Sequence, residues 1–154
     1  TAELFSAATK VGAILAEVGT KEKEALEFYG RNLGLTFQIA DDTLDYNSDL
    51  KMFGKEIGQD FYEGKVTLPI ILLFQKINET EKELINNIFS KTKREKNDLD
   101  YVLKLIKKYS VINECYKKAQ HYIELASSSL SIFRDSEQKE ILNNLTSFSL
   151  ARNF

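Results

Sequence analysis

Apolar residues recur at intervals of three or four positions along most of this 154-residue chain. Such spacing places them on one face of an α-helix, which turns once in about 3.6 residues. No stretch of useful length alternates apolar and polar residues as a half-buried strand would. One proline and seven glycines are too few for a loop-rich fold. The sequence therefore predicts an all-α fold of about seven helices, in a single domain over residues 1–154.

The longest predicted helix, from residue 20 to about residue 45, carries the clearest apolar stripe. Its members are Leu26, Tyr29, Leu33, Phe37, Ala40 and Leu44. Gly30 and Gly34 cost helix stability but thin one face of this helix, which indicates close packing against a neighbour.

The same spacing predicts helices near both ends of the chain. Between residues 3 and 18 the repeating apolar positions include Leu4, Ala8, Val11 and Leu15. In the last helix, which Ser136 can cap, the residues expected to face inward are Ile141, Leu145 and Phe148. In the middle of the chain, the run from Thr80 to Glu83 is typical of a capping box, with Thr80 as the N-cap.

Three carboxylates lie at the end of the long predicted helix. Gln38, Asp41 and Asp45 follow at steps of three and four residues and share one stripe, with Asp42 beside it. Like charges at this spacing destabilise a helix by about 0.2–0.5 kcal/mol per pair, so we expect a positive partner. A solvated helix cap or a charged surface is the simpler alternative.

Mg²⁺ is the partner that these oxygen donors favour, because it is commonly held by one or two carboxylates together with substrate phosphates. A zinc site lacks ligands, since the chain has one histidine, His121, and one cysteine, Cys115. His121 has no carboxylate at an obvious spacing for a nucleophilic dyad. Cys115 lies on an apolar stripe and is interpreted as a core residue.

Helical periodicity stops between residues 46 and 66, where glycines interrupt a polar segment. Two of these glycines directly precede lysines, in Gly54-Lys55 and Gly64-Lys65. The spacing of the glycines and the residue after Lys65 do not fit a P-loop. Lysines close to a carboxylate helix can still bind phosphate oxygens as point charges, whereas an ordinary surface loop is the alternative.

Three neighbouring motifs together resemble a known family. They read Phe37-Gln38-x-x-Asp41-Asp42-x-x-Asp45-Tyr46, Gly54-Lys55-x-x-Gly58-x-Asp60 and Glu63-Gly64-Lys65-x-Thr67-Leu68-Pro69. This series resembles the second aspartate-rich motif and the following loop of trans-type isoprenyl (polyprenyl) diphosphate synthases. It is nearest to long-chain members such as the octaprenyl diphosphate synthases. The segments Thr1-Ala2-x-Leu4-Phe5 and Gly12-Ala13-Ile14-Leu15-Ala16 resemble the family's preceding helix.

The resemblance implies the isoprenoid/terpenoid synthase fold and a Mg²⁺-dependent prenyltransferase. Such an enzyme joins an allylic prenyl diphosphate to isopentenyl diphosphate in isoprenoid biosynthesis. The implied metal ligands are Asp41, Asp42 and Asp45. The implied catalytic residues are Gln38, Lys55 and Lys65. The implied substrate-binding residues are Thr1, Phe37, Gln38, Lys55, Asp60 and Lys65.

The family's first aspartate-rich motif is absent from these 154 residues. We therefore expect the C-terminal half of a longer enzyme, inactive alone, that forms a homodimer or pairs with the missing N-terminal half. One alternative is a terpene cyclase-type lyase, although those enzymes favour an Asn/Asp, Ser/Thr and Glu triad as their second metal motif. The other is a non-catalytic half-synthase that binds another subunit through its apolar surface.

Charge and composition argue against other classes of function. The net charge is −2, and no basic stripe predicts binding to nucleic acid or to anionic lipid. No apolar run reaches the roughly eighteen residues that would predict a transmembrane helix. A single cysteine permits no internal disulfide, which favours a reducing compartment, and we expect a cytoplasmic protein.

Overall fold

The computed structural model describes residues 1–47 and 57–151, and the side chains as far as Ser149. Within these ranges the chain forms eight α-helices and one short 3₁₀-helix, with no strand, so the all-α prediction is confirmed. The helix beyond the expected seven is α3 (Gln59–Glu63), which lies in the glycine-punctuated segment. None of the helices among the described residues combines the length and apolar character that crossing a bilayer requires.

The chain divides into two compact units. Among the described residues, the first unit comprises 1–40 and 116–151, and the second comprises 41–47 and 57–115. The boundaries fall within α2 (Thr20–Leu44) and α7 (Val111–Ser129). The proposal of a single domain stays a prediction.

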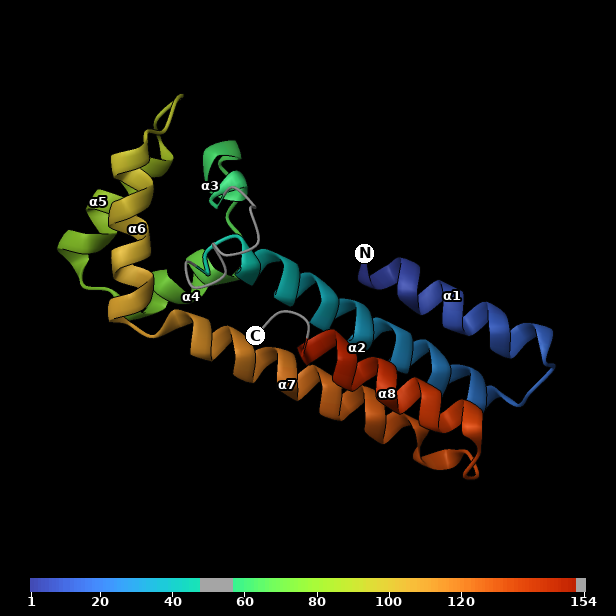
Figure 1. Cartoon of the computed structure of the whole chain (residues 1–154). Helices are drawn as coiled ribbons and strands as arrows, with labels where there is room; N and C mark the ends of the chain where they lie inside the picture. The colour runs from blue at the N-terminus through green and yellow to red at the C-terminus, as the bar shows by residue number, and fades with distance from the viewer. Residues whose placement is uncertain (48–56, 152–154) are drawn as a thin grey trace. The chain divides into compact units, whose positions relative to one another are not determined.

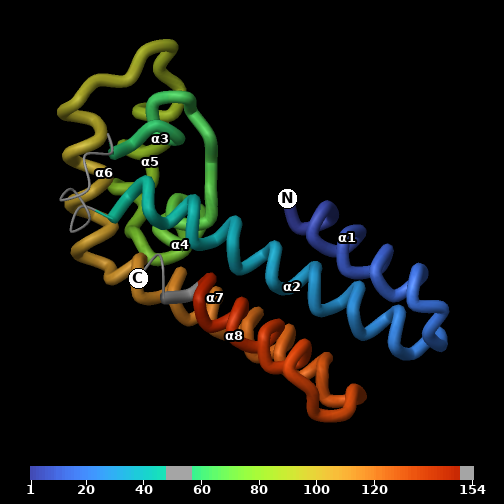
Figure 2. Tube along the Cα trace, turned by 45° about the vertical axis from the view of Figure 1, so that its right-hand side comes forward, coloured from blue at the N-terminus to red at the C-terminus, as the bar shows by residue number. Residues whose placement is uncertain are grey.

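The first unit is a bundle of helices. It contains α1 (Ala2–Leu15), most of α2, most of α7, the 3₁₀-helix η2 (Leu130–Ile132) and α8 (Glu137–Ala151). Figures 1 and 2 show α1 lying beside the first part of α2, and α8 beside α7, each pair antiparallel. The buried core of this bundle joins α2 to α7 and η2, and it consists of Tyr29, Leu33, Ala126 and Leu130.

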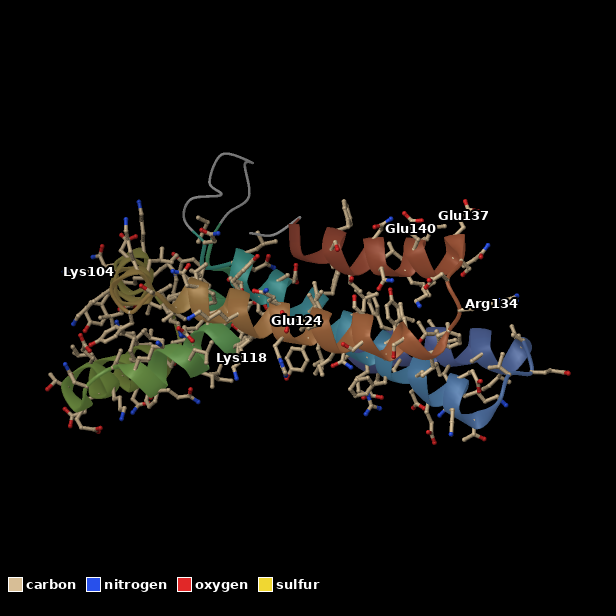
Figure 3. The ribbon with its side chains drawn as sticks, turned by 90° about the horizontal axis from the view of Figure 1, so that it is seen from below. Lys104, Lys118, Glu124, Arg134, Glu137 and Glu140 are labelled. Atoms are coloured by element: carbon tan, nitrogen blue, oxygen red, sulfur yellow. The ribbon has the colours of Figure 1, made fainter. Side chains whose placement is uncertain are left out.

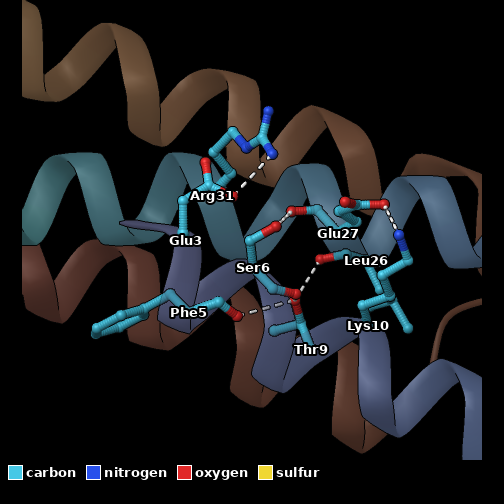
Figure 4. Close-up of polar contacts among 8 residues, drawn as sticks. All are labelled: Glu3, Phe5, Ser6, Thr9, Lys10, Leu26, Glu27 and Arg31. Carbon is cyan, nitrogen blue, oxygen red and sulfur yellow. Dashed lines mark hydrogen bonds and ion pairs between the residues drawn. The ribbon is translucent and has the colours of Figure 1, made fainter. Parts of the chain in front are cut away.

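Polar side chains tie α1 to α2 where the two helices approach closely (Figure 4). The Ser6 hydroxyl donates to the Glu27 carbonyl at 3.2 Å, and the Thr9 hydroxyl donates to the Leu26 carbonyl at 2.6 Å. A side chain at Gly30 would collide with Thr9 and with the α1 backbone. The close packing predicted at Gly30 is therefore confirmed, and α1 is the neighbour.

The outer face of α8 carries residues that were expected to be buried. Ile141, Leu145 and Phe148 are 52%, 44% and 62% exposed, so the prediction that they face inward is wrong. The helix instead packs through Leu142, which contacts the core, and through Thr146, which is buried. Figure 3 shows charged residues of the same unit along α7 and α8, including Glu124, Glu137 and Glu140.

The apolar stripe of α1 also lies in solvent in this chain. Leu4 and Leu15 are 74% and 79% exposed, and Val11 is 51% exposed. The face that contacts α2 is the adjacent one, on which Ser6 and Ala13 are buried. An apolar surface of this kind is typical of a site that another polypeptide covers.

The second unit contains the end of α2, α3, α4 (Leu68–Lys76), α5 (Glu79–Phe89) and α6 (Lys96–Lys108). Figure 1 shows α5 and α6 side by side. Its largest fully buried side chains are Tyr46, Phe61, Leu73, Ile85, Val102 and Val111. Because Phe61 belongs to α3, this short helix contributes to the core of the unit, and the core in turn holds the helix in place.

The start of α5 differs from the predicted capping box. Asn78 is the N-cap, and its side chain and that of Glu81 accept each other's backbone N–H groups, so the prediction of Thr80 as the cap is wrong. Asn78 and Glu81 satisfy the same three-residue spacing two positions earlier. The Glu81 carboxylate also accepts from Lys108 at 2.7 Å and from Tyr109 at 2.6 Å, which ties α5 to the end of α6.

Candidate functional site

The candidate site lies at the end of α2 in the second unit. Asp41 and Asp42 belong to the last turn of the helix, and Asp45 follows directly after it. Asp41 is exposed, and the other two carboxylates are half-buried. Across the described residues, no three Asp, Glu, His or Cys side chains are grouped as ligands for a metal ion. Mg²⁺ binding by these aspartates therefore stays a prediction.

Asp45 caps the start of α3 from a distant position in the sequence. Its Oδ1 accepts the backbone N–H of Gln59 at 2.9 Å, and its Oδ2 accepts that of Asp60 at 2.8 Å. The Asp45 carbonyl accepts the N–H of Gly58 at 3.0 Å. Gly58, the N-cap of α3, has no side chain to perform this task. Asp45 thus fixes the beginning of α3 against the end of α2.

Burial and hydrogen bonding act in opposite directions on Asp45. Desolvation raises the pKa of its carboxyl group, and the negative charge of Asp60 also raises it. The N–H groups of Asp60 and Gln59 lower the pKa in part, because they stabilise the carboxylate. The carboxylate is therefore already engaged by the protein itself.

Lys65 lies just beyond the other end of α3. Its Nζ contacts Asp60 Oδ1 at 2.9 Å and Glu63 Oε2 at 2.8 Å, and its side chain is 56% exposed. Hydrogen bonds to Glu63 and Asp60 raise the pKa of the Lys65 ammonium group, so it is a cation at neutral pH. The structure brings Lys65 and Asp60 into contact, and the Lys65 ammonium group remains accessible to an anion from solvent.

The remaining predicted site residues lie elsewhere in the described chain or outside it. Thr1 is the N-cap of α1 and is exposed, while Phe37 and Gln38 are half-buried on α2 in the first unit. The Phe37 ring packs against Phe5, with ring centroids 5.7 Å apart. Lys55 lies outside the described residues, so its role stays a prediction.

The chain's one cysteine and its one histidine lie outside the acidic motif. Cys115 is fully buried, and burial raises the pKa of its thiol to about 11, in agreement with the interpretation as a core residue. His121 is exposed on α7, where its ring lies 5.7 Å from that of Tyr122.

Sequence reasoning missed two residues that shape the site. Tyr46 follows Asp45 and is buried, and desolvation, followed by the charge of Asp45, raises its pKa. Arg94 contacts both α3 and α5 through its guanidinium group. Tyr46 stood within a recognised motif, but nothing in the sequence around Arg94 relates it to α3.

Comparisons with known proteins found a matching family and several relatives. The family model described as polyprenyl synthetase matches residues 1–106, which include every predicted site residue. A short chain isoprenyl diphosphate synthase of Methanothermobacter thermautotrophicus is 33% identical over 99% of this chain and 46% of its own length. An octaprenyl diphosphate synthase of Haemophilus influenzae is 34% identical over all of this chain and 46% of its own.

Solved structures give the same result for the fold. A decaprenyl diphosphate synthase from Rhodobacter capsulatus matches all of this chain and 47% of its own, with a TM-score of 0.92 and 32% identity. A polyprenyl synthase from Caulobacter crescentus, complexed with calcium and isoprenyl diphosphate, matches with a TM-score of 0.89 and 36% identity, again over 47% of its length.

The fold and these matches define the class as the all-α isoprenoid synthases. The chain belongs to the polyprenyl synthetase family. It spans about half the length of the relatives that it matches.

Proposed function

We propose that this chain supplies the C-terminal half of a Mg²⁺-dependent polyprenyl diphosphate synthase. The observation that carries the proposal is the family match over residues 1–106, together with the Asp and Lys side chains around α3. The reaction would break the C–O bond of an allylic diphosphate, release diphosphate, form a C–C bond to isopentenyl diphosphate and release a proton.

The donor set at the end of α2 fits Mg²⁺. Asp41 and Asp42 offer carboxylate oxygens on one helical turn, and one or two carboxylates with substrate phosphates are a usual Mg²⁺ environment. When bound, Mg²⁺ would neutralise charge that develops on the departing diphosphate. Asp45, whose oxygens accept two backbone N–H groups, would mainly hold α3 in place.

The chain's own residues would bind and orient the diphosphate. Lys65 would exchange its contacts with Asp60 and Glu63 for phosphate oxygens, acting as a point charge. Lys55 would add a second charge from the same segment. Phe37 would provide part of a dry wall that protects a carbocation from water. The family resemblance also implies that Gln38 and Thr1 bind substrate.

The direct test is calorimetric titration of the chain with farnesyl diphosphate, with and without Mg²⁺. We expect Mg²⁺-dependent binding that is lost in Asp41→Ala and in Lys65→Ala, and weakened in Lys55→Ala. Circular dichroism on each variant checks that it is folded. Equal binding by the wild type and the Lys65→Ala variant, or no binding by folded protein, contradicts the proposed site.

We further propose that the isolated chain does not turn over substrate. An incubation with farnesyl and radiolabelled isopentenyl diphosphates should give no extended product, whereas a complex of the chain with the missing N-terminal half should give one. Extended product from the chain alone contradicts this part. A cyclised hydrocarbon instead of a longer diphosphate favours the terpene cyclase-type lyase.

We also propose a cytoplasmic location, since Cys115 has no internal disulfide partner.

A second candidate is a non-catalytic half-synthase, which the exposed apolar stripe of α1 favours. Leu4 and Leu15 are both more than two-thirds exposed. Such a subunit would associate tightly with another chain through this stripe, and Leu15→Lys would abolish the association without weakening diphosphate binding. Sedimentation of the wild type and the variant distinguishes this candidate, because a monodisperse monomer at all concentrations argues against self-association.

A further inference from the structure

Helix α3 is too short to be stable by itself, so its position depends on the contacts at its two ends. It has five residues, whereas an isolated helix needs roughly 12–15 residues to form in water. Asp45 holds the beginning of α3. The C-terminal end of α3 matters more for the proposed binding of diphosphate, because Lys65 lies just beyond it.

Arg94 holds the end of α3. Its Nη1 donates to the Tyr62 carbonyl at 3.3 Å, and its Nη2 donates to the Phe89 carbonyl at 2.6 Å. The carbonyls of the last helical turn lack partners within the helix, and a cation there also interacts favourably with the helix dipole. One side chain therefore links the last turn of α3 to the last residue of α5.

Two aromatic rings pack against this guanidinium group. The Arg94 Cζ atom lies 6.0 Å from the centroid of the Phe61 ring and 5.2 Å from that of Phe89. The two rings are perpendicular, with centroids 5.6 Å apart. Phe61 belongs to α3 and is completely buried, so the guanidinium group is held against the same helix that it caps.

Gly64 allows the chain to turn directly against Arg94. It has a φ of 79°, which favours glycine, and a Cβ there would lie 2.9 Å from both Nη atoms of Arg94. In this turn the Gly64 N–H donates to the Phe61 carbonyl at 3.0 Å, and the Lys65 N–H donates to the Asp60 carbonyl at 2.9 Å. The backbone that orients Lys65 is thus packed on the guanidinium group.

We propose that Arg94 is a positioning residue for Lys65. This inference rests on the proposed function, in which Lys65 binds the diphosphate of the substrate. Arg94 would not contact the diphosphate. It would keep the end of α3 and the Gly64 turn in one conformation, so that Lys65 needs less ordering when it binds the anion.

The first test measures the turn itself and does not depend on substrate. Amide hydrogen exchange at Gly64 and Lys65 should become about tenfold faster in Arg94→Gln, because their hydrogen bonds lose the group that packs on them. Arg94→Lys should show the same defect, since an ammonium group lacks the planar fork that reaches both carbonyls. Exchange at Val102 and Ile106 in α6 should stay slow, which shows that the core of the unit is intact.

The second test measures binding of inorganic diphosphate with Mg²⁺ by calorimetry. The single variant Arg94→Gln should bind diphosphate about tenfold more weakly than the wild type. In a protein that already carries Lys65→Ala, adding Arg94→Gln should cause no further loss of affinity, because the effects of coupled residues are not additive. Arg31→Gln is the matched control, since it removes an equal charge that is paired with Glu3 in the first unit and should leave both measurements unchanged.

The outcomes separate this inference from the proposed function. The inference is overturned if amide exchange at Gly64 and Lys65 is unchanged in Arg94→Gln. It is also overturned if Arg94→Gln causes the same loss of diphosphate affinity in the wild-type protein and in Lys65→Ala. If wild type and Lys65→Ala bind diphosphate equally, the proposed function fails instead. In that case faster exchange in Arg94→Gln still supports Arg94 as the residue that holds the turn.

Discussion

The Asp45 carboxylate accepts the backbone N–H of Asp60 at 2.8 Å, across 15 positions of sequence. Its other oxygen accepts the N–H of Gln59 at 2.9 Å. One member of the acidic motif therefore acts as a helix cap for a different helix. This arrangement places the two remaining aspartates of the motif at a fixed position relative to α3.

Asp45→Ala should destabilise the protein, because it leaves the N–H groups of Gln59 and Asp60 without an acceptor. The loss of an N-cap typically costs about 1 kcal/mol of unfolding free energy. Asp45→Asn should cost less, since its amide oxygen can still accept one of the two N–H groups. Urea unfolding measures both effects.

Asp41→Ala is the matched control for this measurement, because Asp41 belongs to the same motif but is exposed. Its change in unfolding free energy should stay within about 0.5 kcal/mol. Equal losses in the Asp41→Ala and Asp45→Ala variants would argue against capping of α3 by Asp45.

The same region shows what sequence alone could and could not predict. The spacing of Asp41, Asp42 and Asp45 placed all three at the end of a helix, and the structure agrees. The sequence could not predict that Asp45 caps another helix, because this role depends on the formation of α3. Five residues with one buried aromatic side chain give no periodicity, so α3 forms only through tertiary contacts such as those of Asp45 and Arg94.

Periodicity predicted the helices better than the faces that they bury. On α8 a regular series of apolar residues is exposed, and the buried position is Thr146, whose hydroxyl donates to the Asn143 carbonyl at 2.6 Å. On α1 one of the two buried residues is Ser6, whose hydroxyl donates to the Glu27 carbonyl of α2. A hydrophobicity pattern scores both residues as polar, so it cannot recognise that they face a neighbouring helix.

Tyr29 should make the stability of the first unit sensitive to alkaline pH. Its hydroxyl donates to the Leu142 carbonyl at 2.8 Å, and burial raises its pKa to about 12. The phenol of an unfolded chain has a pKa of about 10. The folded state therefore retains this proton at a pH where the unfolded state releases it, and stability falls as pH rises from about 10 to about 12.

Tyr29→Phe removes both the hydrogen bond and the titration. At pH 8 the variant should be less stable than the wild type by about 1 kcal/mol, the usual value of such a hydrogen bond. Above pH 10 this difference should shrink, because only the wild type still loses stability through Tyr29. Guanidinium unfolding at several pH values checks this, and two parallel curves above pH 10 would contradict it.

Cys115 should react slowly with thiol reagents while the protein is folded. Its side chain is fully buried, and its raised pKa of about 11 leaves little thiolate at pH 8. From the thiolate fraction alone, labelling should be roughly a hundredfold slower than in urea. Ser131→Cys in a Cys115→Ala background is the control, since position 131 is exposed and should label rapidly. Similar rates at both positions in folded protein would argue against the buried location.

Two glycines on facing helices should respond to alanine in opposite ways. No atom lies within 4 Å of a Cβ built at Gly12, which is in the interior of α1. Gly12→Ala should therefore stabilise the protein by about 0.5–1 kcal/mol, the difference in helix propensity. The same gain in propensity is available at Gly30 in α2.

At Gly30 the gain is outweighed by a collision, because a Cβ there would lie 2.5 Å from the Phe5 carbonyl oxygen. Backbone atoms of a packed helix move only if the helix itself shifts, which would also weaken the bond from Thr9 to the Leu26 carbonyl. Overpacking of this kind costs about 1–3 kcal/mol, so Gly30→Ala should be net destabilising. The midpoints of thermal unfolding of the two variants measure this difference. If Gly30→Ala were as stabilising as Gly12→Ala, α1 could not lie as close to α2 as the structure places it.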